Sequence, residues 1–138
     1  MNKPVALPFD LTGCVVFVSG GGSTGPGWSI GRASSVTYAR LGAHVCVVDR
    51  DTASAEETTA LILAKGGIAC TFIGDVLATQ QVLPAMIEKG RGSILAISSI
   101  AAMRYVGYPH LACAFLASDA AAYVTGTELV VDGGITEK

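Results

Sequence analysis

The hydrophobic pattern of the first half of the chain alternates short apolar runs with longer segments of helical periodicity. The run Cys14–Val18 is rich in β-branched residues and is closed by glycines, which predicts a strand buried on both faces. Residues 30–41 carry small and apolar positions at helical spacing. Gly42 follows them, where a left-handed C-terminal residue is expected. The pattern therefore predicts a first strand and a first helix.

The same alternation continues further along the chain. Residues 43–48 repeat the buried-strand pattern, and residues 68–73 supply a third strand. Between them, Ser54 and Glu57 form a capping box that predicts a helix ending at residues 65–66. Parallel strands cannot be joined by a hairpin, so this rhythm predicts parallel pairing with right-handed crossovers. The fold class is α/β, with the βαβαβ half of a Rossmann-type doubly wound parallel sheet.

Composition and charge narrow the classes of partner. The 138 residues, 51% hydrophobic and 14% charged, predict a single domain over residues 1–138. The formal net charge of −2 offers no basic field for nucleic acid. No apolar run approaches the roughly 18 residues of a membrane span, and the first residues lack the apolar region of a signal peptide. We therefore expect a cytoplasmic protein with no nucleic-acid or membrane partner.

The four cysteines are widely separated in the sequence. Cys14, Cys46, Cys70 and Cys113 form no CxxC pair and have no histidine at metal-ligand spacing. Three of them lie in apolar, strand-like runs. This pattern predicts small buried thiols in a reducing compartment and no metal site.

A glycine-rich loop joins the first predicted strand to the first predicted helix. It runs from Gly20 to Gly31, with Ser29 and Ile30 immediately before the last glycine. Glycines allow a tight turn and a close approach of the backbone to a pyrophosphate, whose charge the free N–H groups of the following helix would meet. In its strand–loop–helix context, the loop predicts a dinucleotide-binding site that uses these four residues.

An acidic residue follows the second predicted strand. The Asp49 carboxylate would accept hydrogen bonds from the adenosine ribose and repel a 2′-phosphate. Arg50 beside it could instead bind that phosphate. The pair predicts NAD as the cofactor, with NADP as the alternative.

Four more segments carry sequence motifs. Asp75 and Val76 follow the third predicted strand, and residues 92–99 form a largely apolar run that ends in two serines. Residues 115–119 read Phe-Leu-Ala-Ser-Asp, and residues 123–134 end in Asp-Gly-Gly after an apolar run. Together with the glycine loop, these motifs resemble those of the short-chain dehydrogenase/reductase family, in the order in which that family carries them.

The resemblance implies roles for particular residues. Ser29 replaces one of the usual glycines of the family's cofactor loop. The Asp75 carboxylate would contact the adenine amino group, with Val76 beside it, and Ser99 matches the catalytic serine that orients the carbonyl. The implied reaction is reversible hydride transfer between a nicotinamide cofactor and a small alcohol or carbonyl substrate. Family members commonly assemble as homo-oligomers, here expected to be tetramers or dimers.

The same resemblance shows what this sequence lacks. The family's proton donor is a tyrosine whose phenol pKa is lowered by a lysine four residues further on, and no YxxxK motif occurs here. Segments that the family keeps apart meet near residues 76/77 and 110/112, so the family's strands 4 and 6 are not represented. Three explanations fit: joined segments of a longer chain, a natural deletion product, or an engineered fragment.

The missing segments lead to structural expectations and to rival functions. Residues 92–97 would have to pair with the first strand, and residues 128–131 are expected as a final strand. A helix over residues 77–89, kinked by Pro84, would start directly after the third strand. Exposed apolar faces would favour a partner subunit. Two other hypotheses are alternatives to the oxidoreductase. One is a catalytically inactive nucleotide-binding or oligomerisation module, and the other is a fragment that binds no cofactor.

Overall fold

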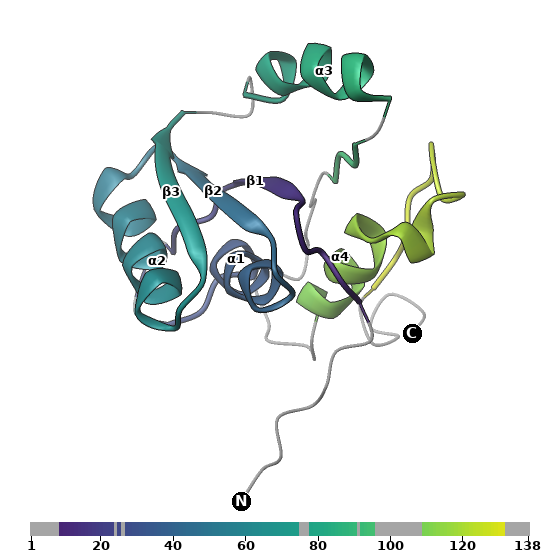
Figure 1. Ribbon diagram of the computed structural model, residues 1–138. Coiled ribbons are helices and arrows are strands. Elements are labelled where there is room, and N and C mark those ends of the chain that lie inside the picture. The colour runs from purple at the N-terminus through teal and green to yellow at the C-terminus, as the bar shows by residue number, and fades with distance from the viewer. Residues whose placement is uncertain are drawn as a thin grey trace, which may run out of the picture.

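The computed structural model describes residues 9–23, 25, 27–74, 78–90, 92–95 and 109–131. Three strands form one parallel sheet in the order β1-β2-β3 (Figure 1). Their bounds are Val15–Ser19 for β1, His44–Asp49 for β2 and Ile68–Ile73 for β3. The parallel βαβαβ arrangement confirms the predicted fold class as an incomplete Rossmann-type sheet.

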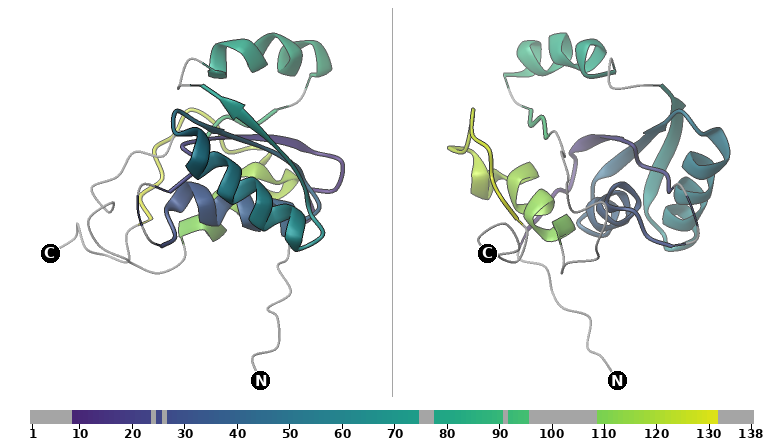
Figure 2. Two further views of the ribbon diagram at one scale, coloured as in Figure 1. Left: turned by 90° about the vertical axis from the view of Figure 1, so that its left-hand side faces the viewer. Right: turned by 180° about the vertical axis from the view of Figure 1, so that it is seen from behind.

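Two helices cover one face of this sheet. They are α1 (Ile30–Arg40) and α2 (Thr52–Ala64), and the views of Figures 1 and 2 place both on the same side of the strands. A third helix, α4 (Pro109–Ala117), packs against α1 and is followed by the short 3-10 helix η2 (Asp119–Ala121). The described segments are therefore layered as α4 on α1, with α1 and α2 on the sheet.

Helix α3 (Ala78–Lys89) stands apart from these layers. It lies on the opposite side of the sheet from α1 and α2 in both views (Figures 1 and 2). It makes no extensive contact with another described element. Pro84 lies inside this helix, as the sequence predicted. The second face of the sheet is therefore not covered by a packed helix among the described residues.

The core lies between the sheet and its two covering helices. Val45 and Val47 of β2 are almost fully buried against Val36 of α1 and Ile62 of α2. Burying one such side chain stabilises a fold by about 1.5–3 kcal/mol. Gly42 has φ +92°, so the left-handed residue expected after the first helix is confirmed.

The start of α2 differs from the prediction. Asp51, and not Ser54, is its N-cap, and the Asp51 side chain accepts a hydrogen bond from the Ser54 N–H at 3.3 Å. Ser54 instead binds the glycine loop, and Glu57 pairs with Arg32. The predicted capping box is therefore wrong, because tertiary contacts use both of its side chains.

The predicted burial of β1 on both faces is also wrong. Val15 and Phe17 point away from α1 and α2 and are 61% and 42% exposed. Residues 92–95, expected as part of a strand beside β1, form no strand, while residues 96–97 lie outside the described residues. Within the described ranges, β1 therefore pairs only with β2 and is an edge strand.

The C-terminal segments show one further difference. Residues 128–131 are exposed and form no strand, so the final strand expected there is wrong. Residues 110 and 112, near which two of the family's segments were predicted to meet, lie in helix α4, and the corresponding position at 76/77 lies outside the described residues. In the part of the chain that the structure covers, no helix combines the length and apolar character that crossing a membrane requires.

The cysteines are less uniformly buried than the sequence predicted. Cys46 is buried, and Cys14 and Cys113 are half-buried. Cys70 is exposed, because β3 is an edge strand and this side chain points to the uncovered face of the sheet. All four thiols are free.

Candidate functional site

The glycine loop begins at the carboxyl end of β1. Gly20 has φ +68°, a left-handed conformation that favours glycine, and a Cβ there would meet no atom within 4 Å. At the other end of the loop, a Cβ on Gly31 would lie 1.9 Å from the carbonyl oxygen of Gly20. The start of α1 therefore packs directly on the end of β1, a contact that only glycine permits.

Ser29 fixes the first turn of α1. It is the N-cap, and its Oγ accepts a hydrogen bond from the Arg32 N–H at 3.0 Å and donates one to the Gly22 carbonyl at 2.5 Å. The N–H groups of Ile30 and Gly31 have no hydrogen-bond partner among the described residues. Unpaired N–H groups at the positive end of a helix dipole favour a bound anion.

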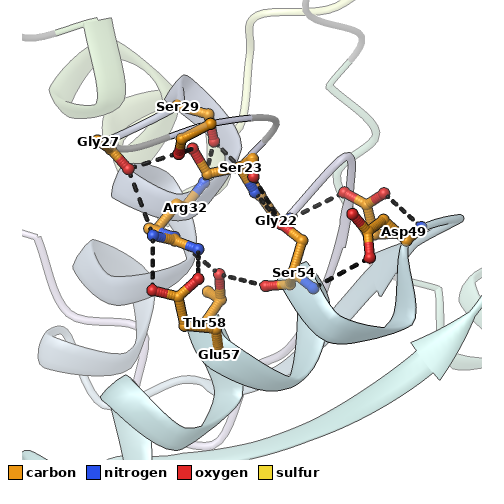
Figure 3. A network of polar contacts seen from close by, with 11 residues as sticks. Gly22, Ser23, Gly27, Ser29, Arg32, Asp49, Ser54, Glu57 and Thr58 are labelled. Carbon is orange, nitrogen blue, oxygen red and sulfur yellow. Dashed lines mark hydrogen bonds and ion pairs between the residues drawn. The ribbon is translucent and has the colours of Figure 1, made fainter.

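Asp49 ends β2 beside this loop. Its Oδ2 accepts a hydrogen bond from the Gly22 N–H at 2.9 Å, and its Oδ1 accepts one from the Asp51 N–H at 3.1 Å (Figure 3). A Cβ on Gly22 would lie 2.8 Å from that Oδ2. A carboxylate has about four lone-pair sites, so two backbone bonds orient Asp49 and leave it able to accept ribose hydroxyl groups.

An ion pair that the sequence did not predict ties the loop to α2. The Arg32 side chain is only 8% exposed, and its Nη2 lies 2.6 Å from Glu57 Oε2 (Figure 3). Its Nη1 donates to the Gly27 carbonyl at 3.3 Å, and its Nε donates to Thr58 Oγ1 at 3.1 Å. The guanidinium is therefore engaged in holding the loop and is not a free phosphate ligand.

Ser23 and Ser54 join the same segments a second time. The Ser23 N–H donates to Ser54 Oγ, and Ser54 Oγ donates to the Ser23 carbonyl at 2.9 Å. An open cavity of about 390 Å³ lies here, lined by both serines together with Arg32, Asp51 and Glu57. Sequence spacing carried no signal for these contacts, because the partners are 25 to 31 residues apart in the chain.

Most of the predicted cofactor residues in the described part gather at the carboxyl edge of the sheet. They are Gly20, Ser29, Ile30, Gly31 and Asp49. Arg50 follows Asp49 and is exposed. The remaining predicted site residues, Asp75, Val76 and Ser99, lie outside the described residues.

The two described tyrosines are not placed as proton donors at this site. Tyr38 is 4% exposed in the core, and burial raises the pKa of its phenol well above its usual range, with the nearby Cys113 adding to the effect. Tyr123 is fully exposed beyond η2. Neither has a lysine four residues further on.

Comparison with known proteins shows which class of protein this chain resembles. The family model described as enoyl-(acyl carrier protein) reductase matches residues 110–136. A crystal structure described as a short-chain dehydrogenase/reductase from Burkholderia xenovorans is 30% identical, with a TM-score of 0.50 over 83% of this chain. Together with the parallel sheet and its glycine loop, these likenesses show that the chain is similar to proteins of the short-chain dehydrogenase/reductase family.

Two curated relatives carry oxidoreductase names. EphD of Mycobacterium tuberculosis, named as an oxidoreductase, is 41% identical over 59 residues, which are 43% of this chain and 10% of that protein. An uncharacterized oxidoreductase of Thermotoga maritima is 35% identical over 88 residues, 62% of this chain and 33% of that protein. The chain also spans 47% of the Burkholderia structure, so it covers less than half the length of each of these relatives.

Proposed function

We propose that this chain is the NAD-binding part of a short-chain oxidoreductase that acts on a small alcohol or carbonyl compound. The observation that carries the proposal is the pair of N–H groups on Ile30 and Gly31 that have no partner among the described residues, beside the bend at Gly20 and the Asp49 carboxylate. The pyrophosphate would be held by the N-terminus of α1, and the adenosine ribose by Asp49. Asp75 and Val76 are proposed for the adenine.

The chemistry follows from what these residues can do. When bound, the nicotinamide supplies or accepts the hydride. The N-terminus of α1 would neutralise part of the pyrophosphate charge, and Ser99 is proposed to orient the substrate carbonyl. Proton transfer in the family's manner needs a tyrosine and lysine pair that these 138 residues do not contain. A complete catalytic site therefore requires residues from outside this sequence.

The cofactor preference is proposed from the end of β2. The Asp49 carboxylate is oriented by two backbone N–H groups, so a 2′-phosphate placed beside it would meet a fixed negative charge. Arg50 is exposed and Arg32 is already paired with Glu57. This arrangement supports NAD over NADP, in a protein for which we propose a cytoplasmic location.

A homo-oligomer, a dimer or a tetramer, is part of the same proposal. The support comes from the edge of β1, where Val15 and Phe17 are exposed on a strand with one unpaired side among the described residues. An exposed apolar edge strand is a surface at which a second chain can pair. Light scattering after size-exclusion chromatography would test it, and a monomer at all concentrations would contradict it.

The cofactor proposal can be tested with the single tryptophan as a probe. Trp28 lies in the glycine loop directly before the helix cap and is 55% exposed, so NADH bound to the loop should quench its emission. Asp49→Asn removes a charged acceptor worth about 1.5–3 kcal/mol, so the Kd for NADH should rise about tenfold or more. Glu56→Gln, an exposed charge removal on α2, is the matched control and should leave the Kd unchanged.

The outcomes separate the oxidoreductase from its rival. Saturable NADH binding together with NADH oxidation on a panel of ketones and aldehydes would support the enzyme. The absence of YxxxK favours the second candidate, a nucleotide-binding module without catalysis, and saturable binding without turnover would select it. If neither NADH nor NADPH binds, both candidates are wrong and the chain is a fragment that binds no cofactor.

A further inference from the structure

Two cysteines face each other on the uncovered side of the sheet. Cys46 of β2 and Cys70 of β3 are direct partners in the parallel register. Aligned residues on neighbouring strands point to the same face, and their backbones are about 4.8 Å apart. Disulfides join residues whose Cα atoms are about 4.4–6.8 Å apart, and the general spacing of paired strands falls within that range.

The surroundings of the pair differ for its two members. Cys70 is exposed on the edge strand, whereas Cys46 is buried on the central strand. Burial raises the pKa of the Cys46 thiol to about 12, and hydrogen bonding to Cys70 adds to the effect, so the two thiols interact. An oxidant in the solvent can therefore reach the thiol of Cys70, which has a second thiol directly beside it.

The other two cysteines do not share this arrangement. Cys14 precedes β1, and Cys113 lies on α4, where it contacts Tyr38 and Ser34. Neither is aligned with another cysteine in the register of the sheet. They therefore provide controls within the same chain.

We propose that Cys46 and Cys70 form a dithiol modification site, at which a peroxide produces a reversible disulfide between β2 and β3. The Cys70 thiolate attacks one peroxide oxygen and becomes a sulfenic acid, while the other oxygen leaves and is protonated to water. The Cys46 sulfur then attacks the Cys70 sulfur, and the sulfenic oxygen leaves as a second water with the Cys46 proton. Two thiols are oxidised and one hydrogen peroxide is reduced to two waters. This site lies outside the proposed cofactor site and does not depend on it.

The products can be located because trypsin places each cysteine in a different peptide. Cleavage after lysine and arginine gives residues 41–50 with Cys46 and residues 66–89 with Cys70. After brief treatment of the full chain with hydrogen peroxide, we expect these two peptides to be linked with the loss of two hydrogen atoms. The thiol titre should fall from four to two per chain and return to four with dithiothreitol.

Matched variants decide whether the pair is specific. Cys70→Ser, at an exposed position, should abolish the linked peptide, and Cys14→Ser should leave it unchanged. Links that join other cysteines at equal yield would overturn the proposal, as would oxidation of Cys70 to sulfinic acid without a disulfide.

A second measurement needs no oxidant. A monosubstituted trivalent arsenical binds tightly only where two thiols are close enough to bind arsenic together. The reduced, folded chain should bind one arsenical, Cys70→Ser should lose that binding, and Cys14→Ser should keep it. Equal binding by both variants would show that the two thiols are not adjacent in solution and would overturn the proposal.

Discussion

The two faces of the sheet are built from the same strands and the same kinds of residue, yet they have opposite surroundings. Val45 and Val47 face α1 and α2 and are 1% and 0% exposed. Val15 and Phe72, on the edge strands of the other face, are 61% and 51% exposed, whereas Cys46 and Val48 of the central strand on that face are 6% and 1% exposed. The difference lies in the neighbours, because both faces are apolar. An apolar strand becomes a core strand only where another element is available to cover it.

The uncovered face also carries a functional implication. Contiguous apolar surface on a folded protein marks a place where another chain or segment binds. Helix α3 has exposed apolar side chains of its own, Leu83 and Ile87, and does not pack on this face. The covered face thus supports the glycine loop, while the open face holds the cysteine pair and the edge proposed for assembly.

The largest expected effect is on the free energy of unfolding, and it compares the loss of one isoleucine side chain on each face of the sheet. Ile62→Ala removes a side chain that is 1% exposed in the covered layer and should lower the free energy of unfolding by about 2–5 kcal/mol. Ile68→Ala, at 56% exposure on the open face, should change it by about 0.5 kcal/mol or less. Urea unfolding measures both, and equal losses would mean that the open face is covered in solution.

Breaking the ion pair between Arg32 and Glu57 should have an intermediate effect on the free energy of unfolding. Glu57→Gln leaves the buried Arg32 guanidinium without its carboxylate, while Glu57 itself is 69% exposed. We expect a loss of about 1–2 kcal/mol, between the value of an exposed pair and the cost of a buried unpaired charge. Glu56→Gln on the same helix is the control for charge alone. Urea unfolding of both variants measures this loss, and identical curves for the two variants would contradict a structural role for the pair.

Polar substitutions on the open face should reduce the exposed apolar surface and change the free energy of unfolding only slightly. Phe17→Thr combined with Phe72→Thr should reduce the fluorescence of a dye that binds apolar surface and change the unfolding free energy by about 0.5 kcal/mol or less. Leu63→Gln, an equally exposed apolar position on α2, should have little effect on the dye. A loss of several kcal/mol in the double variant would show that these rings are buried in solution.

The last expected effect is a pH dependence from Cys46, which is absent at neutral pH and develops only above pH 9. Burial raises its pKa from 9.0 to about 12, so above pH 9 the unfolded chain releases this proton before the folded chain does. The contribution of Cys46 to stability is complete below pH 9 and is lost as the pH rises toward 12. In Cys46→Ala, the free energy of unfolding should therefore decline less steeply above pH 9. An unchanged slope, measured by urea unfolding at several pH values, would contradict this assignment.

Local sequence features were enough to predict much of the first half of the fold. The strand over residues 68–73 was predicted with its observed bounds, and the other elements with shifts of one to three residues at their ends. Gly42 and Asp49 were also placed correctly, because a left-handed glycine after a helix and an acid at a strand end are local signals. The glycine loop was located for the same reason.

Contacts between distant segments could not be predicted in this way. Ser54 and Glu57 have the spacing of a capping box, but Asp51 caps the helix and the other two side chains bind residues of the glycine loop and α1. No local sequence pattern near Arg32 predicts that its guanidinium will be buried against α2. These outcomes depend on which segments meet in space.

The sequence by itself determined the class of fold, the order of the elements in its first half and the positions of the glycine loop and Asp49. Those features depend on periodicity, on glycine conformation and on strand ends, and each of these is set by a few neighbouring residues. Among the described residues, only the tertiary structure decided that helices cover one face of the sheet and not the other, and that Cys70 is exposed beside Cys46. Burial is a property of what packs against a residue, and an apolar run in the sequence does not specify its neighbours.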